Sequence, residues 1–390
     1  MDVAELLELI NTGETSRVQF KREINNDDSI AAEMTAMSNS KGGVILLGIE
    51  DKTGKAVGLD YQQLQSFGNR LAMIANDKVK PQVFIHTEAL AISSETGEKR
   101  VLVVEIAEGI SKPYKDKNGV IWVKQGADKR KLTDNNEILR LFQQSGMLYC
   151  DEMIVPHTSM DDVRLMKVEE YVRTIQKRES DEKVEVTEKL LNNLNIMRKG
   201  RLTLGGLLFF AKHPQKFRPA FCVKAISFFG NSLGGSEYRS SKDIEGTIPE
   251  IFEETMSFFT SNLHHVQGGQ NFNKAGKLEV SQIALEELLQ NALLHRDYSK
   301  NSSVRIMIFD NRIEMASPGS LPNSLTVESI KMGNAAVRNN LLASYCAKLM
   351  TYRGFGSGII RALENQRDIE LINDLEGEQF KAVIPRPAKQ

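Results

Sequence analysis

The chain has 390 residues, of which 41% are hydrophobic, and a formal net charge of -1. At roughly 100 to 200 residues per domain, this length predicts two or three domains. The balanced charge excludes a globally basic nucleic-acid binder, so any such surface must be local. The three cysteines are isolated in the sequence, which argues against a zinc site or a disulfide framework. No apolar run approaches the ~18 residues that span a bilayer, so we expect a cytoplasmic protein without membrane contact.

Residues 1–145 are predicted to form an α+β domain. A helical run covers 29–40, and the apolar run 44–47, bounded by glycines, predicts a buried strand. Turn residues follow at 51–58. Further strands are predicted within 80–92, 99–109 and 118–126, before a helix that ends near Gly146.

Residues 150–245 are predicted to be a connector of short helices and one strand. Two short helices flank a Lys-Gly-Arg turn at 199–201, an arrangement similar to a helix-turn-helix unit. The second of them, 202–211, is apolar on every side, which favours burial over a role in reading DNA. A strand is predicted within 219–230.

Residues 246–390 are predicted to form the last domain. Helices at 247–263 and 277–295 precede strands at 303–310 and 312–319, and 379–385 is the last strand. The stretch 264–277 is the most loop-like part of the chain.

The helix predicted at 277–295 contains a carboxylate and an amide in apolar surroundings. Glu287 and Asn291 are four residues apart, so they project from one face, and His295 continues that line. Because a buried carboxylate needs a partner, this pair must face protein or ligand. Mg2+ and phosphate oxygens would supply that partner. The alternative is that Glu287 bridges to a core arginine.

Glycine-rich turns follow this helix in the sequence. Pro318 and Gly319 lie in a tight turn after a strand, and Gly354, Gly356 and Gly358 precede a helical run. Glycines at a helix start let backbone N–H groups approach a phosphate. Such triplets are common, so the informative feature is their order after the ExxxN helix and the strand pair.

The segments 286–298, 311–322, 335–349 and 353–359 resemble the C-terminal ATP-binding module of RecG-related bacterial regulators, a divergent member of the GHKL ATPase superfamily. The resemblance implies a GHKL-like α/β sandwich that binds ATP and Mg2+, in which Glu287 polarises the attacking water and Asn291 is the metal ligand. The implied nucleotide-binding residues are Asn291, His295, Ser317, Gly319, Gly354, Gly356, Ser357 and Gly358. One departure is that Ala316, Ser317, Pro318 and Gly319 replace the turn whose Asp reads adenine in GHKL proteins.

The segments 13–24, 36–60 and 111–133 resemble the Schlafen/AlbA-type domain, which implies binding of DNA or RNA. Some Schlafen relatives are RNases that use three acidic residues. Glu14 and Asp51 match two of them as candidate catalytic residues, but Gln19 stands at the position of the other. An amide is a poorer Mg2+ ligand than a carboxylate, so we expect weakened cleavage that Gln19→Glu restores. The counter-case is that Glu23, four residues after Gln19, or Glu50, next to Asp51, supplies the absent charge. The alternative for Glu14 and Asp51 is turn and helix-cap chemistry.

A basic stretch with interleaved aromatics closes the N-terminal domain. Lysines that neutralise phosphates and aromatics that stack on bases are typical of sequence-tolerant nucleic-acid grooves. The predicted nucleic-acid-binding residues are Lys21, Lys112, Tyr114, Trp122, Lys124, Lys129, Arg130 and Lys131. The alternative is a solvated hairpin face.

The sequence thus predicts an ATP-responsive, nucleic-acid-binding regulator of transcription that forms homo-oligomers. Two alternatives stay open: a Schlafen-type metal-dependent RNase or DNase, for which defence is one candidate role, and a scaffold with a vestigial nucleotide pocket. A helicase is not indicated, because the sequence has no GxxxxGK[ST] motif and no helicase motor halves.

Overall fold

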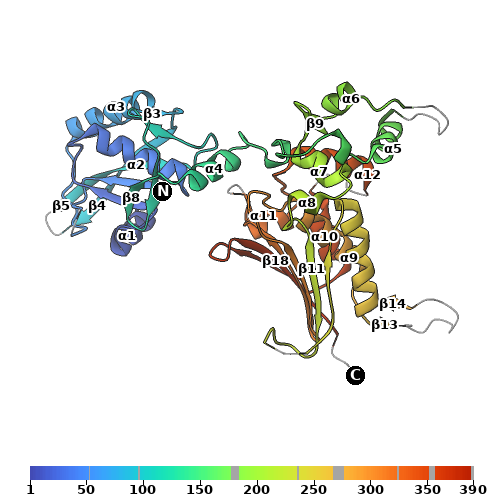
Figure 1. Cartoon of the computed structure of the whole chain (residues 1–390). Helices are drawn as coiled ribbons and strands as arrows, with labels where there is room; N and C mark the ends of the chain where they lie inside the picture. Colours follow the sequence, from blue (N-terminus) through green and yellow to red (C-terminus); the bar gives the residue numbers. More distant parts are fainter. Residues whose placement is uncertain are drawn as a thin grey trace. The chain divides into compact units, whose positions relative to one another are not determined.

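The computed structural model describes residues 1–51, 53–94, 97–176, 184–234, 237–266, 276–322, 325–350 and 356–387. The chain forms two compact units, residues 1–148 and 149–390, each with helices and sheets (Figure 1). The predicted α+β class is confirmed. No helix in these ranges combines the length and apolar character that crossing a bilayer needs.

The first unit is built on a four-stranded sheet in the order β1-β2-β5-β4. β1 and β2 are parallel, and the other pairs are antiparallel. The strands are β1 (Val18–Lys21), β2 (Gly43–Leu47), β4 (Ile85–Ser94) and β5 (Gly97–Ile106), and the helices are α1 (Val3–Thr12), α2 (Asp27–Asn39), α3 (Tyr61–Asp77) and α4 (Asn135–Gln144).

Successive side chains of these strands point to opposite faces of the sheet, and a hydrophobic core forms on each face. Leu46 and Val103 pack in one core with Leu6 of α1. Leu47 and Val104 pack in the other, which includes Met34 of α2. Helices therefore cover both faces of the sheet.

A small hairpin packs beside α2. It consists of β7 (Trp122–Gln125) and β8 (Asp128–Lys131), and a separate two-stranded pair joins β3 (Val79–Lys80) to β6 (Lys115–Asp116). Asn39, the last residue of α2, fixes this region, since its Nδ2 donates to the carbonyls of Tyr114 (2.8 Å) and Trp122 (2.9 Å). Its Oδ1 accepts from the Tyr114 N–H at 2.7 Å.

The second unit contains a six-stranded sheet in the order β12-β11-β15-β16-β18-β17. β11 and β15 are parallel, and every other neighbouring pair is antiparallel. The strands are β11 (Val223–Phe228), β12 (Tyr238–Ile244), β15 (Val304–Ile308), β16 (Arg312–Pro318), β17 (Glu370–Asp374) and β18 (Gln379–Pro385). Helices α9 (Ile248–Asn262), α10 (Gln282–Leu294) and α13 (Ser357–Asn365) complete an α/β sandwich, and Figure 1 shows α9 and α10 against one face of the sheet.

The remaining elements of this unit are short. The helices are α5 (Leu165–Gln176), α6 (Glu188–Asn193), α7 (Leu204–Phe210), α8 (Pro214–Phe217), α11 (Val327–Lys331), α12 (Asn340–Leu349) and two 3-10 turns, η1 (Cys150–Glu152) and η2 (Met160–Asp162). The short strands are β9 (Met197–Arg198), β10 (Arg201–Leu202), β13 (His265–Val266) and β14 (Lys277–Leu278). Of the predicted loop 264–277, residues 267–275 lie outside the described residues.

Residues 150–245, the predicted connector, do not form a separate module in the structure. Its strand β11 pairs with β15, and α7 shares one continuous core with α10 and β16. Every residue of α7 is buried, as its apolar composition predicted, so this helix presents no surface to DNA. The predicted boundary near residue 245 therefore falls inside one compact unit.

Candidate functional site

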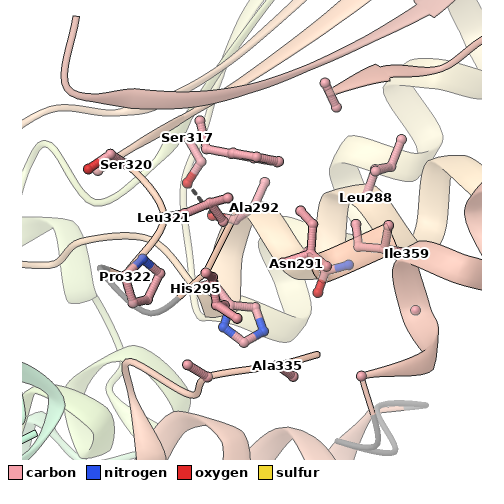
Figure 2. Close-up of a pocket in the computed structure, with 18 of the residues that line it drawn as sticks. Leu288, Asn291, Ala292, His295, Ser317, Ser320, Leu321, Pro322, Ala335 and Ile359 are labelled. Carbon is pink, nitrogen blue, oxygen red and sulfur yellow. Dashed lines mark hydrogen bonds between the residues drawn. The ribbon is translucent and has the colours of Figure 1, made fainter. Parts of the chain in front are cut away.

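Helix α10 projects polar side chains from a largely buried body. Ser281 caps its N-terminus by accepting from the Ala284 N–H, and most of its leucines are buried in the core. Asn291 and His295 are four residues apart, so both side chains reach one cavity, where Figure 2 shows them. The Asn291 Nδ2 atom is buried and has no hydrogen-bond partner. An unpaired buried amide costs about 1–3 kcal/mol, so this group favours a ligand in the cavity.

The walls of this cavity are mostly apolar, as is usual for small-molecule sites. Apolar side chains come from α10, β16, β18, α13 and the segments around α11: Leu288, Ala292, Met315, Leu321, Pro322, Leu325, Ile330, Ile359, Phe380 and Ala382. The polar side chains that line it belong to Asn291, His295, Ser317, Ser320 and Asn334. Mostly apolar walls with a few polar side chains suit a nucleotide, whose base has apolar faces and polar edges.

Ser317 and Gly319 line the cavity at the end of β16. The Ser317 hydroxyl donates to the Ala292 carbonyl at 2.7 Å, the dashed line in Figure 2, and ties the strand to α10. Gly319 has a φ of +99°, and a Cβ there would lie 2.5 Å from the Cβ of Asp297. None of the described residues that line the cavity is Asp or Glu, so the adenine-reading carboxylate of GHKL proteins has no counterpart among them.

The start of α13 closes over Glu287 and Asn291. Gly356 caps this helix in the left-handed region, with a φ of +72°. A Cβ on Gly358 would lie 2.6 Å from Glu287 Oε2 and 3.3 Å from Asn291 Nδ2, so only glycine leaves both side chains in place. Gly356 and Gly358 line the cavity, whereas Ser357 begins the helix without lining it. Gly354 lies outside the described residues.

Glu287 has an arginine partner that the sequence analysis did not name. Its Oε1 lies 2.6 Å from Nη2 of Arg361 on α13. Burial raises the pKa of Glu287 above its ordinary value, and the Arg361 guanidinium acts in the opposite direction. Glu287 is not among the residues that line the cavity. In this structure Glu287 is thus paired with an arginine, as in the alternative stated for it. The sequence feature that could have indicated Arg361 is its position three residues after Gly358.

His295 ends α10 and is neutral at pH 7. Burial, followed by the nearby Arg338 charge, lowers its pKa from 6.5 to about 4. Its surface is only partly covered, because the imidazole lines the cavity. A neutral imidazole can both donate and accept hydrogen bonds there.

The predicted acidic site of the first unit is internally paired. Glu14 Oε1 accepts from the Gln19 amide and from the Phe20 N–H at 2.8 Å. Asp51 forms an ion pair with Lys21 and also accepts from the Arg22 N–H at 3.2 Å. Glu14 and Asp51 thus make the turn and strand contacts of the structural alternative. Across the described ranges, no cluster of three or more His, Cys, Asp or Glu side chains is arranged to hold a metal ion.

Three predicted nucleic-acid contacts are buried, which corrects that interpretation. Lys112 is 2% exposed and bonds to Glu108 at 2.6 Å and to the Ser40 carbonyl. Tyr114 is buried in the α2-side core. The Lys124 side chain is 1% exposed and pairs with Glu33 at 3.3 Å. A run of lysines predicts a surface, but these ones satisfy acids and carbonyls from elsewhere in the unit.

The rest of the basic stretch is partly exposed. Lys129 pairs with Glu33 at 2.9 Å, and Arg130 forms two hydrogen bonds to Glu137 at 2.6 and 3.1 Å. Lys131 lies 5.5 Å from the centre of the Trp122 ring, a cation–π contact. These two residues form the part of the hairpin that combines an aromatic ring with a cation lacking an acidic partner among the described residues.

Family models match three parts of the chain. Residues 14–133 match the model "Schlafen, AlbA_2", and residues 301–382 match "Putative ATP-dependent DNA helicase recG C-terminal". Residues 139–224 match a domain of unknown function, DUF8451. The second match begins after α10, so Glu287 and Asn291 precede it. The chain therefore has a Schlafen/AlbA_2 domain followed by a domain of the recG C-terminal ATPase type, which confirms the predicted order.

Two further comparisons add little to this assignment. No curated protein matches the chain. Among solved structures, the DIP2311 protein from Corynebacterium diphtheriae is similar, with 19% identity and a TM-score of 0.46, over 99% of this chain and 80% of that protein. The two domain types themselves indicate a nucleic-acid-associated, ATP-utilising protein.

Proposed function

We propose that the cavity beside Asn291 binds Mg-ATP, and that nucleotide binding controls the conformation or assembly of a nucleic-acid-binding regulator of transcription. The observation that carries the proposal is that Asn291 lines a mostly apolar cavity and its buried Nδ2 atom has no hydrogen-bond partner. The Asn291 side-chain amide has nearly the same shape when it is rotated by 180°, so its oxygen can take the place of Nδ2 and face a cation. Bound Mg2+ would neutralise phosphate charge, and Asn291 would be its protein ligand.

Other residues of the cavity support a nucleotide in chemically distinct ways. The apolar walls can bury a base, while neutral His295 and the Ser320 hydroxyl offer hydrogen bonds without adding charge. Gly356 and Gly358 line the cavity at the start of α13, where backbone N–H groups favour an anion.

Isothermal titration of the full chain with ATP and Mg2+ tests the proposal. We expect one site per chain in the wild type and a loss of at least about tenfold in affinity for Asn291→Ala, since the variant lacks the ligand side chain. Asn193→Ala is the matched control, because Asn193 is exposed on α6 in the same unit. A wild type without nucleotide affinity would instead favour the scaffold with a vestigial pocket.

Nucleic-acid binding by the first unit is the other half of the proposal. It is supported by the Schlafen/AlbA_2 match and by the partly exposed Trp122 beside the exposed Lys131. Fluorescence anisotropy with labelled single-stranded RNA and DNA, with and without Mg-ATP, measures whether the two activities are coupled. A nucleotide-dependent change in affinity or in oligomeric state is expected.

A further inference from the structure

Acidic and basic side chains of the first unit pair with one another where the sequence predicts the Schlafen-type acidic site. The acids are Glu14, Glu33 and Asp51, and the bases are Lys21, Lys124 and Lys129. The three negative charges are thus matched by three positive ones. A divalent cation would find no excess negative charge here.

Lys124 is the centre of this arrangement. Its Nζ lies 3.1 Å from Gln19 Oε1, 3.3 Å from Glu33 Oε2 and 2.5 Å from the Ala127 carbonyl oxygen. An ammonium group has three N–H donors, so these three oxygens use all of them. The side chain is 1% exposed, and Glu33 is itself buried. A buried lysine surrounded by oxygens holds a positive charge where a bound cation would.

Gln19 is matched to this lysine on one side and to Glu14 on the other. Its Oε1 accepts from Lys124, and its Nε2 donates to Glu14. A carboxylate at position 19 accepts but cannot donate, so it would face Glu14 as a like charge. The neutral amide is therefore the side chain that fits between an ammonium and a carboxylate.

We infer that the Lys124 ammonium is the resident cation of this site, in place of a divalent metal, and that Gln19 is the neutral residue this exchange requires. The residues present do not fit Mg2+ or Mn2+. The inference deepens the proposed function, since it makes the first unit a binding domain without metal-dependent cleavage. It also changes the expectation for Gln19→Glu: a new carboxylate would pair with Lys124 and would not complete a metal site.

Titration of the full chain with Mn2+ in the absence of nucleotide, followed by electron paramagnetic resonance, tests the inference. We expect no stoichiometric site in the wild type or in Gln19→Glu. The double variant Gln19→Glu/Lys124→Met removes the internal cation and adds a carboxylate, so it should bind one Mn2+ at least about tenfold more tightly than the wild type. Lys131→Met is the control for loss of a lysine on the same hairpin.

Three results would overturn the inference. One is stoichiometric Mn2+ binding by the wild type that is lost in Glu14→Ala. Another is binding by Gln19→Glu alone that equals that of the double variant. The third is a folded double variant that gains no affinity.

A second measurement keeps the inference testable if the double variant does not fold. Lys124→Met leaves the buried Glu33 with a single lysine partner, so its melting temperature should fall further than that of Lys131→Met. Lys124→Met/Glu33→Gln removes both charges and should recover part of the loss. Equal melting temperatures for Lys124→Met and Lys131→Met would refute the assignment. Neither measurement involves nucleotide or nucleic acid, so failure of the proposed function would not be mistaken for failure here.

Discussion

Glu287 Oε1 lies 2.6 Å from Arg361 Nη2, and this ion pair joins α10 to α13. The carboxylate implied to polarise water is therefore neutralised by the helix whose first residues close over it. Any role for Glu287 in hydrolysis requires that Arg361 release it. Because Gly356 and Gly358 at the start of α13 line the cavity, we expect a ligand there to affect the pair of Glu287 and Arg361.

Substitution of either partner separates binding from hydrolysis. Glu287→Gln should keep Mg-ATP affinity within about threefold and lower any kcat by about a hundredfold or more, the range of a lost general base. Arg361→Gln removes a charge that lowers the pKa of Glu287, so the acidic limb of its pH–rate profile should move to higher pH. Steady-state phosphate release between pH 5 and 9 measures both effects. Unchanged turnover in Glu287→Gln would exclude it as the base.

Gly358→Ala tests the close approach of α13 to α10. The added Cβ would lie 2.6 Å from Glu287 Oε2, and Arg361 restrains that carboxylate, so the glutamate and α13 must move apart. We expect Mg-ATP affinity to fall by about tenfold, since a 1 Å displacement of a binding group is costly. Titration calorimetry measures this loss.

A matched glycine provides the control for that variant. Gly68 lies in α3, and a Cβ there meets nothing within 4 Å. Gly68→Ala should therefore stabilise the protein by about 0.5–1 kcal/mol through helix propensity and leave nucleotide binding unchanged. Equal affinities of Gly358→Ala and Gly68→Ala would show that the contact with Glu287 is irrelevant to binding.

The sequence predicts those parts of the fold that depend on local apolar patterns. The runs that became β2, β11, β15 and β16 were identified because their hydrophobic residues dominate their segments. β12 was missed, since its sequence YRSSKDI is polar and it lies at the edge of the sheet. Its partner is β11, the preceding strand, but an edge strand with polar side chains on both faces lacks the apolar pattern that predicts a strand.

At the candidate sites, burial of charged groups was the feature that the sequence predicted least well. Lys112 and Lys124 belong to a lysine-rich stretch that is typical of a surface, yet their partners, Glu108 and Glu33, neutralise them inside the unit. Glu33 gave one available signal, because it is a carboxylate within the helical run 29–40. Which lysine would reach it depends on the path of the chain between α2 and β7, and local patterns do not determine that path.

Lys131 and Trp122 should account for most of the contribution of the hairpin to nucleic-acid binding. Lys131→Ala should reduce the slope of log affinity against log salt by about one unit, whereas Arg130, paired with Glu137, should contribute less. Trp122→Ala should weaken single-strand binding by about 1–3 kcal/mol if a base stacks on the ring. Anisotropy titrations at several salt concentrations measure the salt slope and the loss of affinity, with Lys348→Ala in the second unit as control. Equal salt slopes for all variants would place the interface elsewhere.

His295 gives the second unit a pH dependence whose sign can be worked out. Its pKa is about 4 in the folded chain and 6.5 in its ordinary state, so the unfolded chain binds more protons between these values. The free energy of unfolding should therefore fall as the pH drops from 6.5 to 4. The shift corresponds to at most about 3.4 kcal/mol, and access of solvent to the cavity reduces this contribution to about 1–2 kcal/mol. His295→Gln cannot take up this proton, so it should lose less stability on acidification than the wild type.

Urea unfolding followed by circular dichroism at pH 7.5 and pH 4.5 measures the difference. His264→Gln is the control, because His264 is exposed in the same unit and should change nothing. If His295→Gln and His264→Gln lose stability equally on acidification, the imidazole of His295 is not held neutral by its surroundings.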